Sequence, residues 1–295
     1  MRVIKKIAEI KSEIAKLNQK IAFVPTMGAL HDGHLALVKK AGELADIVVV
    51  SIFVNKAQFN DLRDYEKYPR QDDLDLKKLE NCGVDLVFLP DEKEMFADDF
   101  SLKIVPTKMT DCLCGSARVG HFEGVALVVT KLFNIIKPQI AIFGEKDFQQ
   151  LQIIKKLVKD LNLDVEIFSN EIVREKSGLA MSSRNQRLSE ASKIKAANIF
   201  RILTEIKDEV ANDAKNMRKI LQNKREEFLK IGFEKVDYLE IRSTENLELI
   251  ENFDSKKSAR IFVAVYLDGV RLIDNLSFII YGLLRHCVPR NDELT

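Results

Sequence analysis

The apolar positions of this chain follow two alternating patterns, one with the spacing of a helix and one without interruption. Five apolar residues near the N-terminus recur at helical spacing among Lys and Glu: Ile4, Ile7, Ile10, Ile14 and Leu17. We therefore expect the chain to begin at once with an amphipathic helix. The run 47–54 is continuous and rich in β-branched residues, which is typical of a parallel strand buried on both faces.

The two patterns then alternate along the first part of the chain. Shorter apolar runs predict strands at 21–24, 85–90, 139–143 and 165–168. Helical spacing returns between them, at 35–41, 74–79, 124–136 and 151–161. This alternation indicates right-handed βαβ units, so the predicted fold is α/β, a Rossmann-like parallel sheet with helices on both faces. The stretch 98–120 breaks the pattern and is expected to be a loop-rich excursion that could act as a flap.

The pattern changes after residue 184. Two charged helical segments are predicted at 190–210 and 214–231, followed by a strand at 236–241. A hairpin is predicted next, with strands 260–267 and 270–273 joined by Asp268-Gly269. These elements indicate a smaller α+β domain, with the boundary between 175 and 188. The expected organisation is a Rossmann-like domain (1–180), a C-terminal domain that closes over a cleft (181–280) and a tail (281–295).

Composition narrows the possible functions. The 295 residues include 46 Lys and Arg against 45 Asp and Glu, a net charge of +1 that does not suit nucleic-acid binding. No apolar run approaches membrane-spanning length, and the N-terminus lacks the apolar core of a signal peptide, so we expect a cytoplasmic protein. The four cysteines show no spacing typical of a disulfide framework or a zinc site.

The segment Pro25–His34 (PTMGALHDGH) combines the end of a strand, a turn with two glycines and the start of a helix. Backbone N–H groups at such a junction commonly bind phosphate, and Gly28 and Gly33 would let the backbone approach a ligand closely. His31 and His34 lie three apart, on one helix face, where they can donate hydrogen bonds to phosphate oxygens. In the structural alternative, His31 caps the turn and His34 is a solvated helix residue.

Polar clusters also follow three other predicted elements. They are Asn55 with Gln58, Lys146 with Asp147, Gln149 and Gln150, and Met181-Ser182-Ser183-Arg184. Each cluster alone has a structural interpretation, as turn residues, a capped surface helix or a helix N-cap. Neutral amides suit a small polar substrate, whereas an ammonium, hydroxyls and a guanidinium suit phosphates. Since all of them fall near strand ends, they predict one site for a nucleotide and a small acid.

With these residues in view, the chain resembles the pantoate–β-alanine ligase (pantothenate synthetase) family. Residues 25–34 are similar to its Pro-Thr-Met-Gly-x-Leu-His-x-Gly-His motif, itself related to the His motif of class I aminoacyl-tRNA synthetases and nucleotidyltransferases. Further matching blocks follow in order at 50–59, 68–70, 120–125, 143–150 and 181–185. The resemblance extends from Ile4 to Asn275, and the combination of blocks is far more specific than any one of them.

The resemblance implies an ATP-dependent ligation in two steps. Pantoate attacks the α-phosphorus of ATP to give pantoyl adenylate and pyrophosphate, and β-alanine then displaces AMP to give pantothenate. It also implies Mg²⁺ with the ATP, small-molecule partners only and a homodimer. Asp75 is expected to contribute a carboxylate to the metal.

The family's site residues carry over position by position. The implied ATP-binding residues are Met27, Gly28, Ala29, Leu30, His31, Asp32, Gly33, His34, Gly144, Glu145, Lys146, Asp147, Val173, Met181, Ser182, Ser183 and Arg184. The implied catalytic residues are His31, His34, Lys146, Ser182, Ser183 and Arg184, with His34 often assigned as proton donor. Gln58 and Gln150 would bind pantoate, and Gln58 and Asn55 would lie near β-alanine.

Two positions depart from the family pattern, because Lys56 and Val119 stand where proline is usual. They affect the expected loop conformations and no proposed catalytic residue. Two other functions remain open from the residues alone. A nucleotidyltransferase would retain the nucleotide in its product, although a phosphorylated acceptor would favour more Lys or Arg than the amides at 55 and 58. A binding protein without catalysis would need a nucleotide cleft only.

Overall fold

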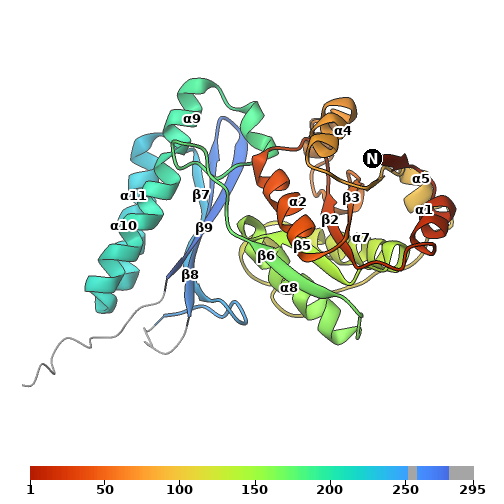
Figure 1. Cartoon of the computed structure of the whole chain (residues 1–295). Coiled ribbons are helices and arrows are strands. Elements are labelled where there is room, and N and C mark those ends of the chain that lie inside the picture. Colours follow the sequence, from red (N-terminus) through yellow and green to blue (C-terminus); the bar gives the residue numbers. More distant parts are fainter. Residues whose placement is uncertain (252–257, 279–295) are drawn as a thin grey trace, which may run out of the picture.

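The computed structural model describes residues 1–251 and 258–278, which form two sheets with their helices (Figure 1). The larger sheet is fully parallel, with strand order β1-β4-β3-β2-β5-β6. Its strands are β1 (Arg2–Ile4), β2 (Ile21–Thr26), β3 (Ile47–Ile52), β4 (Leu86–Phe88), β5 (Ile140–Gly144) and β6 (Glu166–Asn170). The predicted Rossmann-like α/β fold is confirmed.

Alternate side chains of the central strands are buried on opposite faces of this sheet. Phe23 and Val49 belong to one apolar cluster, which includes residues of α1, α7 and α8. Val24 and Val50, one residue along each strand, belong to a second cluster with α2 and α4. Helices therefore cover both faces, which explains the uninterrupted apolar runs in the sequence. The helices are α1 (Ile7–Ile14), α2 (Asp32–Leu44), α3 (Leu62–Glu66), α4 (Asp72–Asn81), α5 (Glu92–Met95), α6 (Leu113–Ala117), α7 (His121–Ile136) and α8 (Phe148–Asp160).

The strand order reverses between β2 and β5. The chain proceeds from β2 through β3 to β4 on one side, and from β5 to β6 on the other. The loops that follow β2 and β5 consequently diverge at their shared carboxyl edge, which is where ligands bind in open α/β sheets. The first of these loops carries the His31–His34 segment and the second carries Lys146.

The rest of the described chain forms the smaller α+β unit predicted from the sequence. Its antiparallel sheet pairs β8 with both β7 and β9, and the expected hairpin turn lies at Asp268-Gly269. Figure 1 shows α10 and α11 on the face of this sheet that is turned away from the parallel sheet. The elements are α9 (Glu190–Ala196), α10 (Asn198–Asn212), α11 (Met217–Ile231), β7 (Lys235–Ser243), β8 (Ala259–Leu267) and β9 (Val270–Phe278). The predicted tail, 281–295, lies outside the described residues.

The structure corrects two predicted helices. Residues 2–4 form β1 rather than the start of a helix, because Ile4 pairs with Phe88 of β4 and is 1% exposed. An isoleucine three residues before Ile7 fits a helical period by coincidence, and sheet pairing decides its conformation. The predicted helix 190–210 is divided into α9 and α10 at Ala197.

The excursion at 98–120 is largely without regular structure and contains the short helix α6. Gln149 of α8 fixes it, since its side chain donates to the carbonyls of Met109 and Cys112 and accepts from the N–H of Cys114. The three described cysteines, 82, 112 and 114, are free thiols. None of the helices formed by residues 1–251 and 258–278 has the length and apolarity needed to cross a membrane.

Candidate active site

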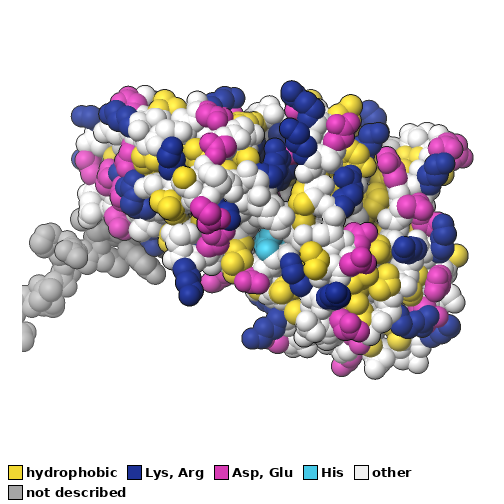
Figure 2. Space-filling model, turned by 90° about the horizontal axis from the view of Figure 1, so that it is seen from above, with side chains coloured by type: hydrophobic (Ala, Val, Ile, Leu, Met, Phe, Trp, Pro, Cys, Tyr) yellow, Lys and Arg dark blue, Asp and Glu magenta, His cyan; other side chains and the backbone are white. Residues whose placement is uncertain are grey.

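Two adjoining cavities lie between the parallel sheet and the smaller unit. The outer cavity has a volume of about 490 Å³ and the inner one about 230 Å³. In the space-filling view, a histidine side chain is visible in the hollow between the two parts of the molecule (Figure 2). Both cavities are lined by the same central polar residues: Arg118, His121, Lys146, Asp147, Gln150, Ser182 and Arg184. The cleft is therefore continuous and strongly cationic.

The two histidines of the first motif form a reciprocal cap on α2. His31 precedes the helix, and its Nδ1 accepts from the N–H of Gly33 at 3.1 Å. His34 Nδ1 accepts from the N–H of His31 at 3.3 Å, and the two rings lie 4.1 Å apart between centroids. A Cβ on Gly33 would lie 2.8 Å from the His31 ring, so the ring position requires glycine there. The capping role of His31, which the structural alternative proposed, is observed, but capping occupies only one nitrogen of each ring.

Both imidazoles are neutral at pH 7. Burial lowers the pKa of His31 to about 4, and the positive charge of Lys146 adds to this effect. Burial also lowers the pKa of His34 to about 3, with a further contribution from His31. Since each Nδ1 accepts a backbone N–H, the single ring proton lies on Nε2. His31 and His34 are consequently neutral hydrogen-bond donors in the inner cavity.

Asp75 has a different role from the expected one. Its side chain is fully buried, and its two oxygens accept from the N–H groups of Ala29 at 2.7 Å and Leu30 at 2.8 Å. It therefore anchors the loop after β2 to α4. The structure corrects the assignment of Asp75 as a metal ligand, because its oxygens are committed to the backbone. Nowhere in residues 1–251 and 258–278 do three or more His, Cys, Asp or Glu side chains group as a metal site.

The amides of Asn55 and Gln58 lie together in the wall of the inner cavity. Asn55 Nδ2 donates to Gln58 Oε1 at 3.1 Å and to the carbonyl of Gly124 in α7 at 3.0 Å. A Cβ on Gly124 would lie 2.5 Å from the backbone of Ala57, so this close approach of α7 requires glycine. Lys56 is exposed, and its ammonium lies over the Tyr65 ring.

The turn after β5 presents Lys146 to both cavities. Lys146 belongs to the 3-10 turn Glu145–Asp147, which leads directly into α8. Asp147 makes no side-chain cap on that helix, so the capping role considered for it is not observed. Of the two glutamines that follow, Gln150 lines both cavities, whereas Gln149 is used to hold the 109–114 segment.

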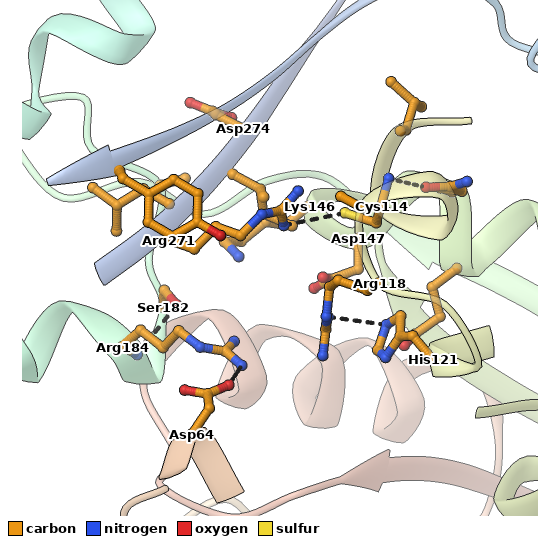
Figure 3. A pocket seen from close by; sticks show the side chains of 18 of the residues that line it. Asp64, Cys114, Arg118, His121, Lys146, Asp147, Ser182, Arg184, Arg271 and Asp274 are labelled. Atoms are coloured by element: carbon orange, nitrogen blue, oxygen red, sulfur yellow. Dashed lines mark hydrogen bonds and ion pairs between the residues drawn. The ribbon is translucent and has the colours of Figure 1, made fainter. Parts of the chain in front are cut away.

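The third cluster connects the two units of the molecule. Ser183 Oγ donates to the carbonyl of Ala29 at 3.0 Å, and Ser182 Oγ accepts from the N–H of Arg184. Asp64 pairs with two guanidinium groups, Arg184 at 2.8 Å and Arg187 at 2.9 Å. Figure 3 shows the Asp64–Arg184 pair on the side of the cleft that faces Arg118 and His121. Ser183 thus connects the two units and also lines the inner cavity, while Ser182 and Arg184 line both cavities.

Most of the expected site residues meet in the inner cavity. It is lined by Met27, His31, Gly33, His34, Asn55, Gln58, Gly144, Lys146, Asp147, Gln150, Val173, Met181, Ser182, Ser183 and Arg184. Five expected ATP-binding residues are not in its lining: Gly28, Ala29, Leu30, Asp32 and Glu145. Three of these form the buried loop held by Asp75, Asp32 is exposed on α2, and Glu145 is directed to Arg260 and Ser169.

Two site residues were not assigned a role from the sequence, Arg118 and His121. His121 Nδ1 donates to the carbonyl of Gln58 at 2.8 Å, and Arg118 lies 3.1 Å from both His121 Nε2 and that same carbonyl. Burial lowers the pKa of His121 to about 3, so its Nε2 accepts from Arg118. Figure 3 shows these side chains directed toward each other. The only sequence signal for His121 was the matching block at 120–125, and Arg118 lies outside all the matching blocks.

A parallel sheet with neutral histidine donors and a lysine at its reversal point defines a Rossmann-like nucleotide-binding enzyme. Comparison with known proteins shows to which family of such enzymes the chain is similar. The family described as Pantoate-beta-alanine ligase matches residues 2–277. Pantothenate synthetase of Caldicellulosiruptor saccharolyticus is 46% identical over 279 residues, which is 94% of this chain and 99% of that protein. The corresponding protein of Thermosipho africanus is 45% identical over the same shares of 94% and 99%.

Solved structures agree with this result. Pantothenate synthetase from Thermus thermophilus has a TM-score of 0.88 and 39% identity, covering 95% of this chain and 100% of that one. Pantoate-beta-alanine ligase from Francisella tularensis, complexed with beta-gamma ATP and beta-alanine, has a TM-score of 0.81 and 38% identity, covering 94% and 97%. The chain belongs to the pantoate-beta-alanine ligase family.

The anchoring role of Asp75 can be tested with Asp75→Asn. An amide in place of the carboxylate loses charge-assisted hydrogen bonds to Ala29 and Leu30, so the free energy of unfolding should fall by about 2 to 3 kcal/mol. Urea unfolding measures this loss, with the exposed Asp73→Asn on the same helix as the control. The dependence of activity on Mg²⁺ concentration should stay as in the wild type. A raised Mg²⁺ requirement with unchanged stability would restore the metal assignment.

The neutral histidines also predict how stability depends on pH. His31, His34 and His121 have pKa values of about 4, 3 and 3, below the ordinary value near 6.5 of an unfolded chain. Between these values the unfolded chain binds more protons, so stability falls as the pH is lowered below 6.5. Each histidine should cost about 2 kcal/mol at pH 5 relative to pH 7.5. Urea unfolding at pH 7.5 and pH 5 measures the difference in the free energy of unfolding, and this difference should be about 2 kcal/mol smaller in His34→Asn than in the wild type. An equal difference in the two proteins would contradict the prediction.

Proposed function

We propose that this ligase joins pantoate to β-alanine in the cleft between the two units, with ATP as the second substrate of the first step. The family to which the chain belongs supports this reaction, as does the related Francisella tularensis complex with beta-gamma ATP and beta-alanine. The observation that carries the assignment is the meeting of His31, His34 and Lys146 at one edge of the sheet.

In the first step, a carboxylate oxygen of pantoate forms a bond to the α-phosphorus while the bond to the β-phosphate breaks and pyrophosphate leaves. His31 and His34 donate hydrogen bonds from Nε2 to phosphate oxygens as negative charge accumulates there. Lys146 and Arg184 add positive charge. Because the His34 pKa is about 3, its role is hydrogen-bond donation to phosphate rather than the expected proton transfer.

Gln58 and Gln150 are proposed to bind pantoate, with Asn55 holding the Gln58 amide in place. Neutral amides orient the acid without forming an ion pair, so its carboxylate stays nucleophilic. Pantoyl adenylate must then be protected from water until the amine arrives, and the smaller unit (181–280) is proposed to provide that protection by closing over residues 1–180.

In the second step, the amine of β-alanine attacks the acyl carbon, an amide forms, AMP leaves and the nitrogen gives up a proton. The carboxylate of β-alanine takes no part in the chemistry and needs a fixed positive partner. We assign this role to Arg118, whose guanidinium is oriented by His121 and the Gln58 carbonyl at the boundary of the two cavities.

The described residues offer no protein cage for a divalent ion, which fits Mg²⁺ held mainly by ATP phosphates and water. Mg²⁺ would supply charge neutralisation of the triphosphate when bound, and no residue of this chain is assigned to it. We also propose the homodimeric state that the resemblance implies and the cytoplasmic location expected from the hydropathy of the sequence.

Product analysis tests the reaction. The purified protein is incubated with Mg-ATP and pantoate, with and without β-alanine. AMP, pyrophosphate and pantothenate should appear together only when both acids are present. A nucleotide joined to an acceptor in the product would favour a nucleotidyltransferase. ATP binding by the folded protein with no turnover in any mixture would leave only a binding function.

Arg118→Gln tests the β-alanine assignment. Loss of a charge-assisted contact should raise the KM for β-alanine about 10- to 100-fold and leave the KM for ATP in the pantoate-dependent first step nearly unchanged. Arg63→Gln is the matched control, because Arg63 lines the outer cavity but is exposed and paired with Asp61. An Arg118→Gln variant whose defect lies in adenylation alone would assign this arginine to pantoate or phosphate.

A further inference from the structure

Strand β9 of the smaller unit passes beside the turn that carries Lys146. Asn275 of this strand is 2% exposed, and its Nδ2 donates to the carbonyls of Glu145 at 3.0 Å and Lys146 at 2.9 Å. Its Oδ1 accepts from Arg260 of β8. Both amide protons of Asn275 are thus used on the backbone of the turn that follows β5 of the parallel sheet, which is far away in the sequence.

Arg260 holds the same turn through a side chain. Its Nη2 donates to Glu145 Oε2 at 2.9 Å, and its guanidinium lies 3.9 Å from the centre of the Phe148 ring at the start of α8. The second Glu145 oxygen accepts from Ser169 of β6 at 2.9 Å. Glu145, which does not line the inner cavity, therefore connects the turn to both sheets.

The neighbouring residue on β9 fixes the segment that joins the two units. Asp274 accepts two hydrogen bonds from Arg174, at 2.6 and 2.9 Å, and is 3% exposed. Arg174 also donates to the carbonyl of Gly178. Figure 3 shows Asp274, Arg271 and Lys146 on the same side of the cleft. Asp274 therefore holds the segment that connects the two units (174–178), and Asn275 holds the turn that carries Lys146, called the lysine turn below (Glu145–Asp147).

The lysine turn depends on these contacts because it has no side-chain cap of its own. Neither Gly144 before it nor Asp147 at the start of α8 provides a capping hydrogen bond. A single turn of 3-10 helix is a weak structure without tertiary support. The backbone from which the Lys146 side chain extends toward the two histidines is consequently held in part by β8 and β9.

We propose that Asn275 and Arg260 are positioning residues that make adenylation depend on the docking of the smaller unit. They touch no reacting atom and act through the backbone of Lys146. Adenylate formation then proceeds at full rate only when β9 lies against the turn, an arrangement in which β9 also lines the outer cavity. The inference rests on the proposed role of Lys146 at the phosphates.

A double-mutant cycle tests the proposal, using Asn275→Ala and Lys146→Ala separately and together in the full chain. The readout is pantoate-dependent adenylate formation from ATP in single-turnover quench experiments with enzyme in excess, which follow slow variants for hours. Asn275→Ala should lower the rate at saturating ATP about 10- to 100-fold, the cost of a small misplacement of a catalytic group, and change the apparent affinity for ATP little. In the Lys146→Ala background it should cause no further loss.

The control is Val263→Ala, in the core of β8 and outside both cavity linings. It destabilises the same sheet without touching the lysine turn, so its adenylation rate should match the wild type at temperatures where it is folded. Equal losses from Asn275→Ala in both backgrounds, or a similar loss in Val263→Ala, would overturn the inference and leave a structural role. An undiminished rate in Lys146→Ala alone would reject the proposed function of Lys146, and with it the route by which Asn275 is argued to act.

Discussion

A carboxylate that is removed from water must be surrounded by hydrogen-bond donors, and this constraint shapes the phosphate-facing loop. Asp75 takes the N–H groups of Ala29 and Leu30, and Ala29 adopts a positive φ of 49° as the chain turns from β2 toward α2. Lys78 and Ser183 bind the carbonyls of the same two residues. Because Asp75, Lys78 and Ser183 bind the backbone N–H and C=O groups of Ala29 and Leu30, those groups do not face the cavity. The donors that this segment presents to the cavity are the two histidine side chains. The order of the motif follows from that division: first the buried loop, then the two imidazoles.

The three described histidines illustrate how one side chain serves structure and chemistry together. His31 and His34 each use Nδ1 to cap the start of α2 and keep a proton on Nε2. His121 uses Nδ1–H to bind a backbone carbonyl and Nε2 to receive Arg118. Burial keeps all three neutral at pH 7. A capping role and a binding role are therefore compatible for an imidazole, since its two nitrogens are separately engaged.

The sequence predicted the features that depend on local pattern and missed those that depend on distant pairing. The strands around Phe23 and Val49 and the turn at Asp268-Gly269 were predictable, because burial on two faces and turn chemistry leave direct marks on the sequence. Strand β1 was missed because three residues show no period, and only Phe88 makes Ile4 a strand residue. The site was predictable where a motif faces the cavity, as at His31 or Lys146. Asp75 was misassigned because a carboxylate that binds backbone and one that binds metal look alike in sequence.

The contacts between the two units are of two kinds, and the difference between them bears on how the cleft can close. One kind is apolar: Phe262 packs against Phe148 within the apolar cluster of the parallel sheet, and both side chains line the outer cavity. The other kind consists of ion pairs and hydrogen bonds, such as Arg184 with Asp64 and Asn275 with the lysine turn. Apolar contact resists separation by solvent, whereas exchange of a polar contact for water changes the free energy little. The apolar contact is therefore suited to hold the two units together while the polar contacts exchange with water as substrates enter, and a closed cleft would keep water from an acyl adenylate.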